Sequence, residues 1–132
     1  MLRAIIDTHA LIWQIFSDPR LSKAAETVIH DAIAARDQIA ISSISLAEIV
    51  YLSEKGRIDP STIDLVLDLL KLKELLVEVP VDRAVVLAMR TIPRIQVPDL
   101  PDRVIAATAV HLGVPLISRD AKIQASAVST IW

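Results

Sequence analysis

The chain has 132 residues, which fits a single domain over residues 1–132, and its formal net charge of −2 argues against a strongly basic nucleic-acid-binding surface. It has no cysteine, so disulfides and thiolate metal sites are excluded and the reducing cytoplasm is the simplest expectation. No apolar run reaches the roughly 20 residues of a membrane span, and no signal peptide is expected at the N-terminus.

Short aliphatic runs alternate with helical patterns along the whole chain. The runs typical of buried strands fall, in chain order, on residues 2–6, 38–42, 75–81, 114–118 and 128–132. The helical patterns fall on residues 8–16, 22–37, 43–56, 61–75, 81–92, 102–113 and, as a short helix or turn, 119–124. This alternation predicts an α/β fold in three layers, with a mostly parallel sheet of four to five strands flanked by helices.

Some helix ends are marked by residues that suit them. Ser22 and Ser61 are expected to cap the helices that follow them, because a serine hydroxyl accepts a hydrogen bond from the first turn. Gly56 and Gly113, the only two glycines, are expected to end helices.

Four acids stand at the start of a predicted helix or just inside one: Asp7, Glu48, Asp102 and Asp120. Asp7 and Asp120 each follow a predicted strand, and parallel strands would bring both to one edge of the sheet. Carboxylates from distant segments can together hold a hard cation such as Mg²⁺ or Mn²⁺. The pattern therefore predicts metal-assisted cleavage of a phosphodiester. Without these four acids the formal charge would be +2, so the acidic balance does not exclude a nuclease.

Each of these acids also has an ordinary structural role open to it. Asp7, Asp102 and Asp120 could be no more than helix N-caps, although Asp99 could cap the helix predicted over residues 102–113 and leave Asp102 free. Glu48 could lie on a solvated helix face, but its apolar neighbours indicate a buried helix, in which a carboxylate needs a partner. Capping alone would hardly bring all four to one edge of the sheet.

Other polar residues give weaker signals. Short hydroxyls that could support a ligand are Thr8, Ser43, Ser45 and Ser118. Arg103 and Arg119 flank acids and could meet a phosphate, or could be ordinary surface or structurally paired arginines. His9, His30 and His111 lack a metal-binding spacing, and the His9 side chain is expected to point away from Asp7.

The segments IIDTHALIW, ISSISLAEI, DRVIAATA and LISRD, in this order and spacing, resemble the PIN-domain ribonucleases, and above all the VapC-type toxins of bacterial toxin–antitoxin pairs. The resemblance covers essentially the whole chain. It implies a parallel sheet between helices and an endoribonuclease that uses Mg²⁺ or Mn²⁺ and leaves 5′-phosphate and 3′-hydroxyl ends. The implied metal ligands are Asp7, Glu48, Asp102 and Asp120, supported by Thr8, Asp99 and Ser118. Ala47 departs from the bulkier residue that the family often has before the glutamate.

The resemblance also implies partners besides the RNA substrate: a cognate VapB-type antitoxin and a second copy of the chain in a homodimer. An excess of aliphatic residues, within a hydrophobic fraction of 53%, fits a protein that buries part of its surface against a partner. The predicted groove for the antitoxin is lined by Leu11, Ile12, Trp13, Val50, Tyr51 and Leu52. Trp13 could instead be a plain core residue.

Two other functions fit parts of the sequence. A catalytically silent PIN-fold binding or scaffold module would use the same fold, but such modules usually lack one or more of the acids. A phosphatase of the haloacid-dehalogenase type would need a second aspartate two residues after Asp7, where this chain has His9.

Overall fold

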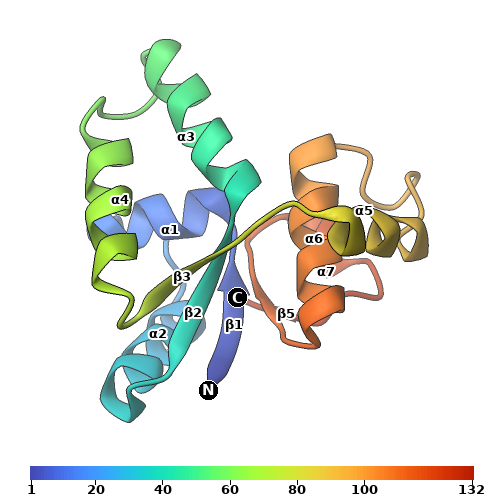
Figure 1. Cartoon of the computed structure of the whole chain (residues 1–132), viewed down its shortest axis with the longest axis horizontal. Helices are drawn as coiled ribbons and strands as arrows, with labels where there is room; N and C mark the ends of the chain where they lie inside the picture. The colour runs from blue at the N-terminus through green and yellow to red at the C-terminus, as the bar shows by residue number, and fades with distance from the viewer.

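A five-stranded sheet forms the middle layer of the protein, and all its strands are parallel. The computed structural model describes residues 1–132, and Figure 1 shows α1, α2 and α4 on one side of the sheet and α5, α6 and α7 on the other. The strands are ordered β3-β2-β1-β4-β5 and span Leu2–Ile6 (β1), Gln38–Ser42 (β2), Leu76–Val79 (β3), Leu116–Ile117 (β4) and Thr130–Ile131 (β5). The predicted α/β architecture is confirmed.

Helices connect successive strands. They span Thr8–Ile15 (α1), Lys23–Ala35 (α2), Ser43–Glu54 (α3), Thr62–Leu72 (α4), Arg83–Ala88 (α5), Leu100–Leu112 (α6) and Ala121–Gln124 (α7), with a 3₁₀ turn, η1, at Met89–Thr91. The helix predicted over residues 81–92 is therefore shorter than expected and tightens into a 3₁₀ turn. None of the helices has the length and apolarity needed to cross a bilayer.

Alternation along the central strands separates the core into two parts. Ala4 and Ile6 of β1 face the helices α1 to α4, whereas Ile5 between them faces α5, α6 and α7. Ile39 and Ile41 of β2 face the first side, and Ala40 faces the second. Because successive side chains of a strand point to opposite faces, one aliphatic run supplies both cores.

The register of β1 fixes the edge of the sheet that matters for function. Ile5 lies beside Ala40 of β2 on one side and beside Leu116 of β4 on the other. The three strands therefore end at the same edge of the sheet, and the residues that follow them lie at that edge. In parallel sheets this carboxyl edge is where ligand sites are built.

One of the four predicted helix ends differs from the sequence-based expectation. Ser22 caps α2 as predicted, its hydroxyl accepting from Ala25 N at 3.1 Å, and Gly113 ends α6 in the left-handed conformation. Ser61 is wrong as a side-chain cap: its hydroxyl lies 2.6 Å from Asp59 Oδ1 instead. Gly56 also ends α3 as predicted: the last helical residue is Glu54, and Gly56 follows the C-cap residue Lys55 in the left-handed conformation, with φ of 68°.

This difference predicts unequal effects of two similar substitutions. Ser22→Ala should lower the free energy of unfolding by about 1 kcal/mol, because the N–H of Ala25 loses its partner. Ser61→Ala should change it by less than about 0.5 kcal/mol, because no helix N–H depends on that hydroxyl. Urea unfolding of both variants, followed by circular dichroism, measures the two values. Equal losses would contradict the assignment of the caps.

Candidate functional site

Asp7 stands where β1 passes into α1. Its backbone N–H donates to Ile117 O at 3.0 Å, which continues the pairing of β1 with β4 by one residue. Its Oδ1 accepts from Ala10 N at 2.8 Å, so the side chain caps α1, and the residue is only 9% exposed. The capping role foreseen as an alternative is therefore real. It occupies Oδ1 in the helix hydrogen bond and leaves Oδ2 free of that bond.

Glu48 is held in place by hydroxyls from two helices. Thr8 Oγ1 lies 2.6 Å from Glu48 Oε1 and 2.8 Å from Ser45 Oγ. A hydroxyl has one proton, so Thr8 donates it to the carboxylate and accepts from Ser45. Thr8 and Ser45 are both buried, and they fix the glutamate of α3 beside the first turn of α1. The predicted supporting role of Thr8 is consistent with this contact.

Asp99 caps helix α6, and this leaves the carboxylate of Asp102 free. Asp99 Oδ1 accepts from Asp102 N at 3.0 Å and caps α6. The carboxylate of Asp102 accepts no hydrogen bond and lies free in the first turn of the helix. Of the two arrangements that the sequence left open, the structure has the one in which Asp99 is the cap.

Asp120 repeats the arrangement of Asp7 at the end of β4. Its Oδ1 accepts from Ile123 N at 2.9 Å and caps the short helix α7. Its backbone N–H donates to the Oγ of Ser118, a residue with no exposed surface. Ser118 therefore fixes the turn that carries Asp120.

The four acids meet at the carboxyl edge of the sheet. One cavity of about 330 Å³ is lined by Asp7, Glu48, Asp102 and Asp120 together with Thr8, His9, Trp13 and Arg119. No group of three or more acidic or histidine side chains is already arranged as a set of metal ligands. The acids thus share a cavity without converging on one point.

Several residues singled out from the sequence behave otherwise. His9 lines the cavity, so the expectation that it points away is wrong: Asp7 is the extended cap residue rather than a helical neighbour, and helical spacing does not relate the two side chains. Arg103 lies elsewhere and donates to Ile92 O and Met89 O, which ties α6 to η1. Ser43 contacts Val79 O at 3.2 Å and supports the sheet.

Burial and mutual repulsion raise the pKa values of three acids in the cavity. Burial raises the pKa of Asp7, although the Ser118 hydroxyl and the Ala10 N–H act against it. Burial also raises the pKa of Glu48, against the hydrogen bond from Thr8. Burial, followed by the charges of Asp99 and Asp120, raises the pKa of Asp102 to about 7. A cavity of this kind favours a bound cation, because a positive charge offsets both effects.

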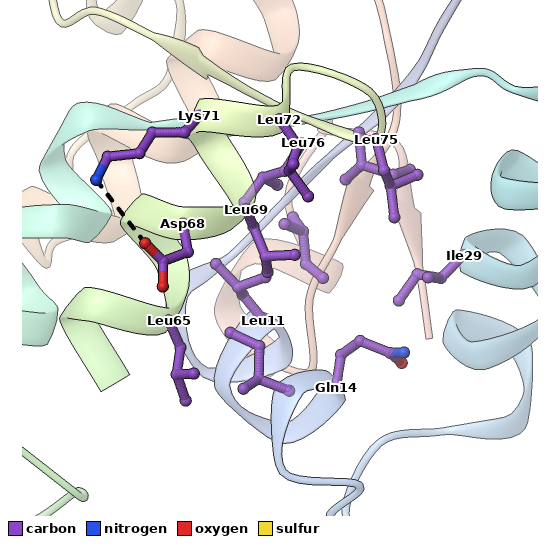
Figure 2. A pocket seen from close by; sticks show the side chains of 13 residues that line it. Leu11, Gln14, Ile29, Leu65, Asp68, Leu69, Lys71, Leu72, Leu75 and Leu76 are labelled. Atoms are coloured by element: carbon purple, nitrogen blue, oxygen red, sulfur yellow. Dashed lines mark ion pairs between the residues drawn. The ribbon is translucent and has the colours of Figure 1, made fainter. Parts of the chain in front are cut away.

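A second, larger cavity is lined mostly by hydrophobic residues and shares no lining residue with the acidic cavity. It has a volume of about 680 Å³ and lies between α4, α1, α2 and one face of the sheet. Figure 2 shows Leu69 and Leu72 of α4 above Leu11 and Gln14 of α1, with Leu65 of α4 beside Leu11. An ion pair between Lys71 and Asp68, 3.8 Å apart, lies on the same helix.

The groove predicted from the sequence differs from this cavity. Leu11, Ile12 and Trp13 are between 5% and 8% exposed, because α1 packs its apolar side against the core. Val50 and Tyr51 are exposed, and Leu52 packs against the core cluster of α1, α2 and α4. The six residues do not share one cavity: Leu11 lines the apolar cavity and Trp13 lines the acidic one. Their role as a groove for the antitoxin stays a prediction.

A parallel sheet with acids gathered at its carboxyl edge defines the class of protein, and a family model confirms it. Residues 4–128 match the PIN domain, and the chain belongs to the PIN-domain family. It is similar to ribonuclease VapC22 of Mycobacterium tuberculosis, with 30% identity over 124 residues, 94% of this chain and 92% of the relative.

Solved structures share the fold. VapBC2 of Rickettsia felis, bound to a DNA fragment from its promoter, matches with a TM-score of 0.71 and 20% identity over 98% of this chain and 97% of that one. FitAcB of Neisseria gonorrhoeae matches with a TM-score of 0.60 and 18% identity over 98% of this chain and 96% of that one. At these identities the likeness concerns the fold.

The raised pKa of Asp102 predicts how stability depends on pH. Its folded pKa of about 7 exceeds the ordinary 3.8, so the folded state binds the proton more tightly than the unfolded state. The free energy of unfolding should therefore fall as pH rises from about 4 to about 7 in the presence of a chelator. Asp102→Asn should remove the part of this loss that comes from Asp102 and raise the free energy of unfolding at neutral pH. The expected gain is only about 1 to 2 kcal/mol, because solvent screens a half-exposed group.

Asp37→Asn provides a control of opposite sign. The hydrogen bond from Arg3 lowers the pKa of Asp37, so this variant should lose stability at neutral pH and match the wild type in acid. Chemical unfolding at a series of pH values measures both. An Asp102→Asn variant that is no more stable than the wild type at neutral pH would contradict the electrostatic account.

Proposed function

We propose that the chain is the toxin of a toxin–antitoxin pair, an endoribonuclease that depends on Mg²⁺ or Mn²⁺ and cleaves RNA in the acidic cavity. The observation that carries the proposal is the meeting of Asp7, Glu48, Asp102 and Asp120, from four separate segments, in one cavity. Similarity to ribonuclease VapC22 over 94% of the chain supports the reaction class.

The donor set fits a hard divalent cation. Carboxylate oxygens are the ligands that Mg²⁺ and Mn²⁺ prefer, and Asp102 has no protein hydrogen bond to give up. Because no three acids converge, one or two carboxylates would hold an ion directly and the others would act through water. Asp7 and Asp102 would be the direct ligands, with Glu48 and Asp120 completing the site.

When bound, the ion would supply an activated water and offset the charge that develops on the phosphate oxygens. The chain itself supplies position and charge. Thr8 and Ser45 orient Glu48, and Ser118 orients the turn before Asp120. The acids alone would repel an RNA phosphate, so RNA should bind weakly in the absence of the ion.

Cleavage of an RNA pool by the purified chain tests the proposal. Asp7→Asn should lower the cleavage rate by about 10³-fold, equivalent to the several kcal/mol that a metal ligand provides, while asparagine preserves the helix cap. Asp82→Asn is a matched control, because Asp82 caps α5 through Val85 N at 3.0 Å in the same way but lies outside the cavity.

The Asp82 variant should cleave at the wild-type rate, and a metal chelator should stop all cleavage. Fragments with 5′-phosphate and 3′-hydroxyl ends would match the expected products. Full activity of Asp7→Asn would contradict the site. A well-folded chain that cuts no RNA with either metal would favour the silent binding module.

For the antitoxin, we propose the apolar cavity between α1, α2 and α4 as the docking site. Ten of its thirteen lining residues are hydrophobic, and Leu72 at its rim is 64% exposed. Such a surface suits the apolar side of a partner helix. The structural match with a toxin-antitoxin complex from Klebsiella pneumoniae supports an antitoxin partner. The homodimer implied by the resemblance stays a prediction.

Substitution at the rim tests the docking site. Leu72→Glu should weaken the complex with the co-expressed cognate antitoxin by about 10-fold or more, because it places a charge in the apolar contact. Leu87→Glu on α5, where the side chain is 52% exposed on the other side of the sheet, should leave the affinity unchanged. Titration calorimetry measures both. Equal affinities for the two variants would place the antitoxin elsewhere.

A further inference from the structure

Arg119 is the only lysine or arginine that lines the acidic cavity. The ion pairs of the chain involve Met1, Arg3, Arg20 and Lys71, and none includes Arg119, although Asp120 follows it directly. Its guanidinium also makes no side-chain hydrogen bond to the protein. A positive group beside several carboxylates, with its donors free, needs a physical explanation.

The side chain lies instead on an indole. The guanidinium carbon of Arg119 is 5.7 Å from the ring centroid of Trp13, within the range of a cation–π contact. Trp13 is 8% exposed and is fixed by its own neighbours: the rings of His9 and Trp132 lie 6.0 Å and 5.7 Å from it. Trp13 thus holds the arginine at the wall of the cavity without using its N–H groups.

The backbone under Arg119 is also fixed. Ser118 N donates to Ile131 O at 3.3 Å, and Gln124 Nε2 donates to the carbonyl of Arg119 at 3.0 Å. Asp120 caps α7 immediately afterwards. Only the side chain of Arg119 is therefore free to move, and a rotation about its own bonds is enough to meet a ligand in the cavity.

Arg20 provides an internal comparison. Its guanidinium carbon lies 4.9 Å from the same indole, but its Nε and Nη2 donate to the two carboxylate oxygens of Asp18, at 3.1 Å and 2.8 Å. Its fork of donors is thus satisfied within the protein, and it does not line the acidic cavity. Of the two arginines on Trp13, only Arg119 can offer this fork to a ligand there.

We propose that Arg119, supported by Trp13, binds a backbone phosphate of the RNA that enters the acidic cavity. A guanidinium presents paired N–H groups that match two phosphate oxygens, and stacking on an aromatic ring orients its plane. The proposal rests on the proposed ribonuclease function and assigns Arg119 the binding of substrate in it. Its charge would oppose the repulsion between the phosphate and the acids.

The test measures RNA affinity without cleavage. In the Asp7→Asn background, a short fluorescently labelled single-stranded RNA of mixed sequence is titrated at several salt concentrations in the presence of Mg²⁺. Adding Arg119→Gln should weaken binding about 10-fold at low salt and reduce the slope of log affinity against log salt by about 0.7, the value for one phosphate contact. Adding Arg20→Gln, which removes an equal charge from the same indole, should leave the slope unchanged.

Arg119→Lys separates charge from geometry. It should restore the slope, because the charge remains, but keep affinity below that of arginine, because an ammonium lacks the paired donors. In the otherwise wild-type enzyme, Arg119→Gln should raise KM about 10-fold for the same RNA. Thermal unfolding of each variant shows that the fold is unchanged, as expected for an exposed side chain.

The outcomes separate the two proposals. If the wild type cleaves RNA and Arg119→Gln leaves both slope and KM unchanged, the role of Arg119 is wrong and the ribonuclease stands. Equal reductions of the slope by Arg119→Gln and Arg20→Gln would show that only the net charge of the protein matters. That result would also overturn the role of Arg119. A wild type that neither cleaves nor binds RNA would overturn both proposals.

Discussion

Parallel pairing of β1 with both of its neighbours is the constraint on which the site depends. Ile5 lies between β2 and β4, and the chain leaves β1 at Asp7, β2 at Ser43 and β4 at Ser118, all at one edge of the sheet. The Asp7 N–H that donates to Ile117 O extends this pairing into the site itself. Since both faces of these strands are buried in aliphatic cores, a one-residue shift of register would move each side chain into the opposite core, where it does not fit. The packing that stabilises the sheet therefore also fixes the acids.

Helix capping and ligand binding use the same side chains here. Asp7 and Asp120 each accept a helix N–H through Oδ1, and both residues line the cavity. The cap holds the carboxylate in one rotamer, so the site is preorganised by bonds that the fold already needs. Asp102 differs, because Asp99 takes over the capping and leaves the whole carboxylate of Asp102 free. It is also the acid whose pKa is raised to about 7. Fold stability and site charge therefore oppose each other most strongly at Asp102.

The two cavities divide the proposed functions between two faces of α1. Its first turn borders the acids through Thr8 and His9, and the side chains of Leu11 and Gln14 border the apolar cavity. Trp13 lies against the acidic cavity and supports Arg119. A partner seated on the apolar cavity would therefore touch the same short helix that positions the acids, which gives a direct physical connection between partner binding and the site.

The sequence by itself determined the order of strands and helices, the three-layer α/β class and the four acids, because periodicity, caps and motif spacing are local properties. It also allowed Asp99 as the cap of α6, although it could not choose between Asp99 and Asp102. Only the tertiary structure decided the surroundings of these residues. How α1 packs against segments distant in sequence decides the direction of the His9 side chain and the burial of Ile12. It also decides the contact of Arg119 with Trp13. Such contacts follow from the arrangement of the whole sheet, and no local pattern encodes them.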